Sequence, residues 1–85
     1  MNEAAQAFEL WKRFAPRFRL HLEIVETVDG PDAYLVSGLD GDDDGAMWVE
    51  IARHEEPIDA MLAACGRLEG ETPYQLGRFR KVEGS

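Results

Sequence analysis

The residues of this chain with the clearest chemical potential form one acidic run, Asp40-Gly41-Asp42-Asp43-Asp44-Gly45. Carboxylates packed this closely repel one another and cannot be buried together, so they must face water, a cation or a basic partner. The alternation of Asp40, Asp42 and Asp44, followed by Gly45, matches the first half of the EF-hand calcium loop, in which spaced carboxylates surround one hard cation. A calcium or magnesium site on these three aspartates is therefore one interpretation.

The second half of that calcium pattern is missing. In a loop that begins at Asp40, the twelfth position should be a bidentate Glu, but it is Ile51, and Glu50 comes one residue too early. The segments on both sides also have the pattern of strands, whereas an EF-hand loop lies between helices. We therefore expect no dedicated cofactor and keep the cation site as an alternative.

Other candidate catalytic groups are sparse. His54 precedes Glu55 and Glu56, a combination that could do acid–base chemistry, but His21 lies far away in the sequence. The chain has no Ser or Cys nucleophile motif, no Gly-rich phosphate loop and no paired-His metal spacing. Cys65 is the only cysteine, which excludes an internal disulfide and suits a reducing compartment. We expect a protein that is not an enzyme.

A third interpretation of the carboxylates is a binding surface, because spaced carboxylates can imitate a phosphate backbone and occupy a groove rich in Arg and Lys. Strict alternation turns Trp48 away from Val49 and Ile51, so that it could act as an aromatic anchor. The residues expected to line one acidic edge and contact a partner are Asp40, Asp42, Asp43, Asp44, Trp48, Glu50, Glu55 and Glu56. The alternative is that Trp48 is covered and the carboxylates are merely solvated.

The acidic charge is concentrated in the middle of the chain. The net charge is −8, and residues 29–71 carry twelve acids against Arg53 and Arg67, a net charge of −10 for that segment. Such a field repels nucleic acid and anionic membranes and attracts basic surfaces. The other explanation of the charge is that it only keeps a small protein soluble.

The N-terminal part of the chain predicts a helix and then a strand. Apolar residues recur at helical spacing over 3–15, with Asn2 as the N-cap, and Pro16 is expected to end the helix. From Phe18 the apolar period changes to two, which predicts a strand over 18–24. A turn over 29–32, Asp-Gly-Pro-Asp, should follow.

The rest of the chain completes an α+β fold. Strands are predicted over 33–39 and 46–53, with the acidic loop between them, and a helix should open at Pro57 and stop before Gly70. The segment 72–82 could add a short edge strand. The expected order is α-β-β-β-α(-β): a three- to four-stranded antiparallel meander with both helices packed on one face. We expect one compact domain over residues 1–82 and a frayed tail over 83–85.

This element order is that of a double-stranded-RNA-binding domain, but the charges are opposite to what RNA binding needs. Those domains hold phosphates with a basic cluster near the start of their final helix, where this chain has Glu55, Glu56 and Asp59. The comparison argues against direct nucleic-acid binding.

The leading expectation is a small acidic binding protein that occupies a basic site, such as a nucleic-acid-binding site, on a protein partner. In size, charge and lack of a catalytic motif the chain is similar to phage-encoded inhibitors such as anti-CRISPR proteins, immunity proteins or DNA mimics. A homodimeric scaffold is a further alternative. Because no secretory leader or membrane-spanning run is evident, we expect the cytoplasm of a bacterium or of a phage-infected cell.

Overall fold

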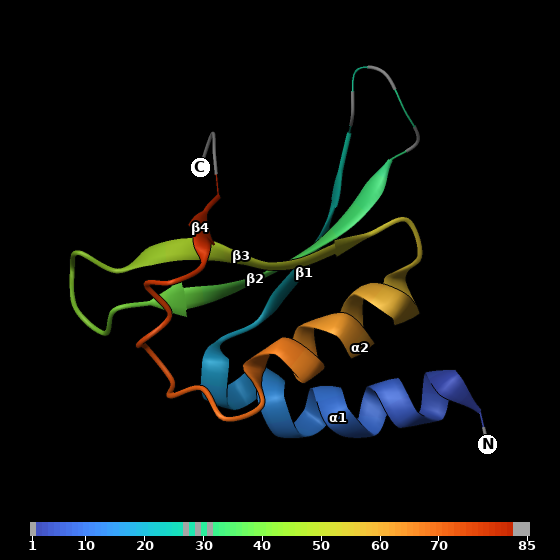
Figure 1. Ribbon diagram of the computed structural model, residues 1–85, viewed down its shortest axis with the longest axis horizontal. Coiled ribbons are helices and arrows are strands. Elements are labelled where there is room, and N and C mark those ends of the chain that lie inside the picture. The colour runs from blue at the N-terminus through green and yellow to red at the C-terminus, as the bar shows by residue number, and fades with distance from the viewer. Residues whose placement is uncertain (1, 27, 29, 31, 83–85) are drawn as a thin grey trace.

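The described part of the chain forms two helices and a four-stranded sheet, as seen in a computed structural model (Figure 1). The structure describes residues 2–26, 28, 30 and 32–82. The predicted turn at 29–32 and the expected tail at 83–85 therefore lie partly or wholly outside the described residues. In chain order the elements are α1 (Glu3–Phe18), β1 (His21–Val25), β2 (Ala33–Asp40), β3 (Met47–His54), α2 (Pro57–Leu68) and β4 (Arg80–Lys81).

The sheet is an antiparallel meander with the strand order β1-β2-β3-β4, which confirms the predicted α+β fold. Leu35 in the middle of β2 pairs with Glu23 of β1 on one side and with Arg53 of β3 on the other. The short strand β4 pairs with β3 only at Val49 and Glu50. Strands β1 and β4 are thus the two edges of the sheet.

Both helices lie on the same side of the sheet (Figure 1). Helix α2 packs against β2 and β3, and α1 packs against α2. The core between these layers is built from aliphatic and aromatic side chains, of which Val36, Val49, Ile51, Leu68 and Leu76 are the largest aliphatic ones. The other face of the sheet carries no helix in the described part of the chain, and we call it the open face.

Helix α1 continues through Pro16, so the predicted end before this proline is wrong. In the last turn of a helix a proline removes only one amide donor, and the chain gains the burial of Phe18 in exchange. The Phe18 ring is 1% exposed and stacks on Phe14 with centroids 6.0 Å apart. Arg19 then ends the helix in the left-handed region, with φ at 57°, and its N–H donates to the Ala15 carbonyl. Phe18 is therefore the last residue of the helix and does not belong to the predicted strand.

The other helix boundaries agree with the sequence. The Asn2 side chain caps α1 by accepting from the Ala4 N–H at 2.9 Å, as predicted. Helix α2 begins at Pro57 and ends before Gly70, which has φ at +85°. Within α2, Cys65 is buried on the side of the core, and this burial raises the pKa of its thiol.

A β-bulge interrupts the alternation of β3. Val36 pairs with Ala52, whereas the next residue of β2, Ser37, pairs with Glu50, so Ile51 is the extra residue. Ile51 and Ala52 are both buried in the core with the helices. Strict alternation from Trp48 would place Ala52 on the same face as Glu50, but the bulge turns Ala52 to the core.

Candidate functional site

The base of the acidic loop is tied to the C-terminal segment. Asp40 Oδ1 accepts the backbone N–H of Leu76 at 2.8 Å, and the Gly41 N–H donates to the Tyr74 carbonyl at 2.9 Å. Tyr74 has φ at 67°, a left-handed conformation that is uncommon for an aromatic residue. Asp40 is half-buried in this arrangement. Its carboxylate therefore holds the fold together at this point and is not simply presented to solvent.

The tip of the loop presents three exposed carboxylates, those of Asp42, Asp43 and Asp44. Asp43 Oδ1 accepts the Gly45 N–H at 2.9 Å, and its carbonyl accepts the Ala46 N–H at 3.0 Å, which fixes a tight turn. The ion pairs within the described residues all lie elsewhere. We call Asp42, Asp43 and Asp44 the acidic tip.

The described residues form no group of three His, Cys, Asp or Glu side chains placed to hold a metal ion. Asp40, the first of the three aspartates in the calcium pattern, directs one oxygen at the Leu76 amide. Asp42 and Asp44 are exposed. The cation site thus has no preformed set of ligands here, and it stays a prediction from the sequence alone.

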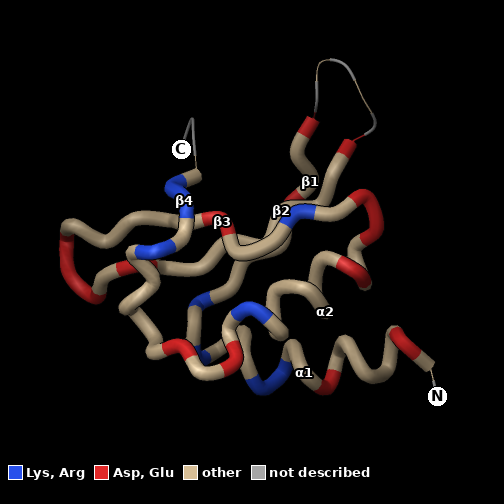
Figure 2. Tube along the Cα trace, in the orientation of Figure 1, with Lys and Arg blue, Asp and Glu red and all other residues tan. Residues whose placement is uncertain are grey.

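The predicted contact residues do not share one edge. The acidic loop precedes β3, whereas Glu55 and Glu56 follow it, so the two acidic groups lie at opposite ends of this strand (Figure 2). Strand β3 has eight residues, and a strand of that length spans about 26 Å. The structure brings together the members of each group but separates the two groups from each other.

Trp48 lies on the open face, as alternation predicts, with 40% of its surface exposed. Its indole ring lies 6.1 Å from the imidazole of His21, measured between ring centroids. A shallow pocket of about 270 Å³ beside it is also lined by Glu23, Ser37 and Val82. His21 was not predicted to belong to a site, and only the register that pairs it with Ser37 places it there.

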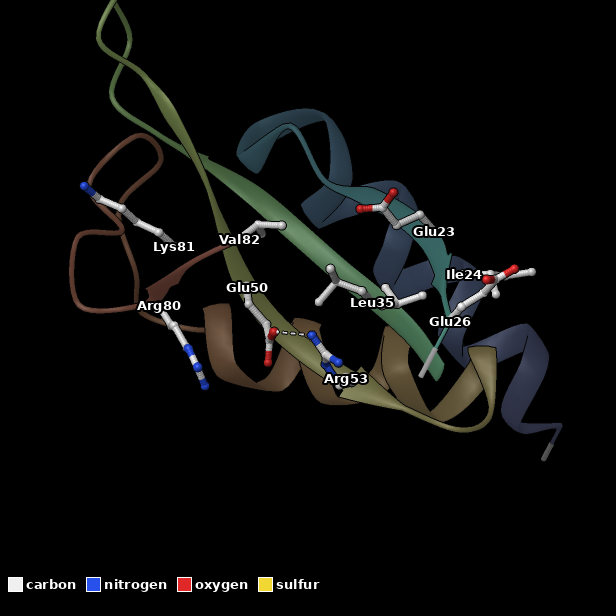
Figure 3. A pocket seen from close by; sticks show the side chains of 10 residues that line it. Glu23, Ile24, Glu26, Leu35, Glu50, Arg53, Arg80, Lys81 and Val82 are labelled. Carbon is white, nitrogen blue, oxygen red and sulfur yellow. Dashed lines mark hydrogen bonds and ion pairs between the residues drawn. The ribbon is translucent and has the colours of Figure 1, made fainter. Parts of the chain in front are cut away.

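A larger groove of about 880 Å³ crosses the same open face (Figure 3). Glu50, expected on an acidic edge, lies inside this groove and accepts from the Arg53 guanidinium at 3.0 Å. Leu35 of β2 lies in the middle of the groove and is only 2% exposed. The residues that line the groove are Glu23, Ile24, Val25, Glu26, Leu35, Glu50, Arg53, Arg80, Lys81 and Val82.

The groove was not anticipated from the sequence. Its charged residues come from three separate segments, and only the pairing of β1 with β2 and of β3 with β4 brings them to one face. The available signal was the basic character of the C-terminal segment, where Arg80 and Lys81 follow Arg78. That signal does not say which strand the segment joins.

The chain matches no protein-family model, no curated protein and no solved structure. Neither helix in the described part of the chain is long and apolar enough to cross a membrane. Two surfaces therefore carry the inference about function: the acidic tip, and the open face with its groove.

Proposed function

We propose that this protein is a small, non-enzymatic binding protein whose acidic tip occupies a basic site on a protein partner. The observation that carries the proposal is the fixed geometry of the loop. Its base is held by the bond from the Leu76 amide to Asp40, and its turn is held by the bond from the Gly45 amide to Asp43. Exposed carboxylates on a loop with this much internal bonding form a ready-made acidic surface.

The fixed loop favours binding for an entropic reason. A loop that is already ordered loses less conformational freedom when a partner binds, so more of the interaction energy appears as affinity. The carboxylates of Asp42 and Asp44 have no cationic neighbour among the described residues. They are thus available to Arg or Lys side chains of another molecule.

The net charge of −8 selects the kind of partner. It accelerates encounter with a positively charged surface and opposes binding to nucleic acid or to an anionic membrane. A groove that binds nucleic acid has the required basic character, so blocking such a groove is the inhibitor-like activity that we propose. Anti-CRISPR proteins, immunity proteins and DNA mimics work in this manner, and the cytoplasm of a bacterium or infected cell is the corresponding setting.

Trp48 is the proposed apolar anchor beside the acidic tip. It lies at the start of β3, four positions after Asp44, and part of its ring is exposed. Aromatic residues of this kind contribute a large share of binding energy when a partner covers them.

The test uses two charge reversals of equal size at the two ends of β3. D42K/D44K changes the tip but leaves the turn-forming Asp43 in place, and E55K/E56K is the matched control. Tagged wild-type protein is used to capture partners from lysate of its native host, and each partner is then purified for titration calorimetry. We expect a basic partner whose affinity falls about tenfold or more with D42K/D44K, with little change for the control.

Circular dichroism of both variants checks that the fold is intact. Equal binding by the wild type and D42K/D44K would show that the tip is only a solvated turn. An equal loss with both variants would show that total charge matters and the loop does not.

A further inference from the structure

The groove on the open face has walls of opposite charge. Glu23 and Glu26 lie on the β1 side, and Arg80 and Lys81 lie on the β4 side (Figure 3). Between them, Glu50 and Arg53 are bonded to each other. The open face therefore has an acidic side along β1 and a basic side along β4, with an ion pair between them.

This pattern is complementary to itself. When two sheets pack face to face about a two-fold axis that runs along the strands, β1 of one copy lies over β4 of the other, and the reverse holds as well. Both acidic walls then meet basic walls, in two equivalent places. We propose that the open face is the interface of a homodimer with this symmetry, and the partner in the groove is a second copy of the chain.

The register of the strands allows these contacts. On one side of the sheet, Glu23 pairs with Leu35 of β2. On the other side, Arg80 pairs with Glu50, and Glu50 pairs with Ser37 of β2. The two walls are therefore two residues apart along β2. The offset along the strand direction is about 7 Å. Long Glu and Arg side chains bridge such an offset between facing sheets, so the acidic wall of one copy reaches the basic wall of the other.

A second copy suits the groove better than a partner of uniform charge. A basic protein would place its cations against Arg80 and Lys81, and an acidic protein would place its carboxylates against Glu23 and Glu26. Only a surface that carries both signs in the right order meets both walls favourably, and this chain itself provides that surface. The half-exposed Trp48, with Val25 and Val82 on the same face, adds apolar area for the copies to bury.

The dimer does not depend on the proposed function, but it affects how the acidic tip would be used. A two-fold axis along the strands keeps positions along the strand direction unchanged. The loops between β2 and β3 of the two copies therefore lie at the same end of the dimer, which gives a pair of acidic tips. Both proposals involve Trp48, but their tests change different residues: Asp42 and Asp44 of the acidic tip for the proposed function, and the charged residues of the groove for the dimer. Failure of one test therefore leaves the other proposal intact.

Sedimentation velocity over a range of protein concentrations tests the interface with complementary charge reversals. E23K/E26K makes both walls basic, and R80E/K81E makes both walls acidic. We expect the wild type to dimerise, each variant alone to become monomeric, and a one-to-one mixture of the two variants to dimerise again. E55K/E56K, away from the groove, is the control and should dimerise like the wild type.

A second measurement on the wild type avoids substitutions altogether. In a mixture of isotope-labelled and unlabelled protein, intermolecular nuclear Overhauser effects should connect Trp48, Val25 and Val82 to the other copy. A wild type that stays monomeric, a mixture that does not recover, or intermolecular contacts confined to another surface would each overturn the proposal.

Discussion

The two faces of the sheet are made by the same strands but have opposite chemistry. On the helix-covered face, Val36, Val49 and Ile51 are at most 2% exposed and pack with side chains of α2. On the open face, Glu23, Glu50 and other charged residues surround a groove, and Trp48 is partly exposed. The comparison shows that the two faces have different roles: one face stabilises the fold, and the other leaves polar and aromatic groups accessible for recognition.

The division is not absolute. Leu35 points into the groove and is still only 2% exposed, because neighbouring side chains on the open face cover it. Asp40, at the end of β2, belongs to an acidic loop and yet bonds to the core segment that contains Leu76. Substitutions that separate stability from recognition show how far the distinction between the faces holds.

The largest expected effect is on the helix-covered face. Ile51→Ala should lower the free energy of unfolding by about 2–5 kcal/mol, because Ile51 is fully buried and the substitution leaves a cavity. Trp48→Ala is the matched substitution on the open face and should lower it by less than Ile51→Ala does, since the ring is already partly solvated. Urea denaturation followed by circular dichroism measures both, and similar losses would refute the division between the faces.

The next largest change in stability is expected at the base of the acidic loop and not at its tip. Asp40→Ala removes the acceptor of the half-buried Leu76 amide and should cost about 1–3 kcal/mol. Asp40→Asn keeps an acceptor oxygen and should cost less, and Asp42→Ala, at the exposed tip, should leave stability unchanged. Thermal and urea unfolding provide the comparison. A loss with Asp42→Ala as large as that with Asp40→Ala would show that the tip is structural as well.

Substitutions of glycine in and just after α2 should have a smaller effect on stability and should not alter the open face. Gly66 lies on the exposed side of α2, and no atom would lie within 4 Å of an added Cβ. Gly66→Ala should therefore raise the free energy of unfolding by about 1 kcal/mol. Gly70→Ala should lower it by a similar amount, about 1 kcal/mol, because Gly70 has a left-handed conformation with φ at +85°. Self-association should be unchanged in both variants, and a change would mean that α2 communicates with the open face.

The smallest effect concerns the ion pair in the groove. Glu50→Gln should change the free energy of unfolding by about 0.5 kcal/mol or less, because both side chains of the Glu50–Arg53 pair are partly exposed and solvent screens their attraction. Denaturant titrations at low and high salt measure this contribution. A loss above about 2 kcal/mol would be typical of a buried pair. It would show that the groove contributes to stability as the core does.

Local signals in the sequence were enough to predict the elements of the fold. The helix that opens at Pro57 and stops before Gly70, and the strands around the acidic loop, follow from caps, turns and apolar periodicity. The end of α1 was missed because Pro16 is a strong local signal against helix, whereas burial of Phe18 is a tertiary effect. The bulge at Ile51 was missed for the same reason, since it depends on how β3 aligns with β2.

The site was less predictable than the fold. The exposed carboxylates of the acidic tip were predicted from the run of aspartates itself, because repulsion keeps such a cluster at the surface. The role of Asp40 depends on a partner 36 positions away, Leu76, which no local pattern reveals. The opposite walls of the groove likewise depend on which strands form the edges of the sheet.

The bond between Asp40 and Leu76 also has a consequence for the order of events during synthesis. The acidic loop leaves the ribosome well before the segment around Leu76, and until that segment has emerged the Asp40 carboxylate and the Gly41 amide lack their native partners. The core strands and α2 can associate earlier, because they precede this segment in the chain. Nascent chains stalled before Leu76 would thus carry an acidic loop without its mature shape. The loop acquires that shape only when the C-terminal segment docks.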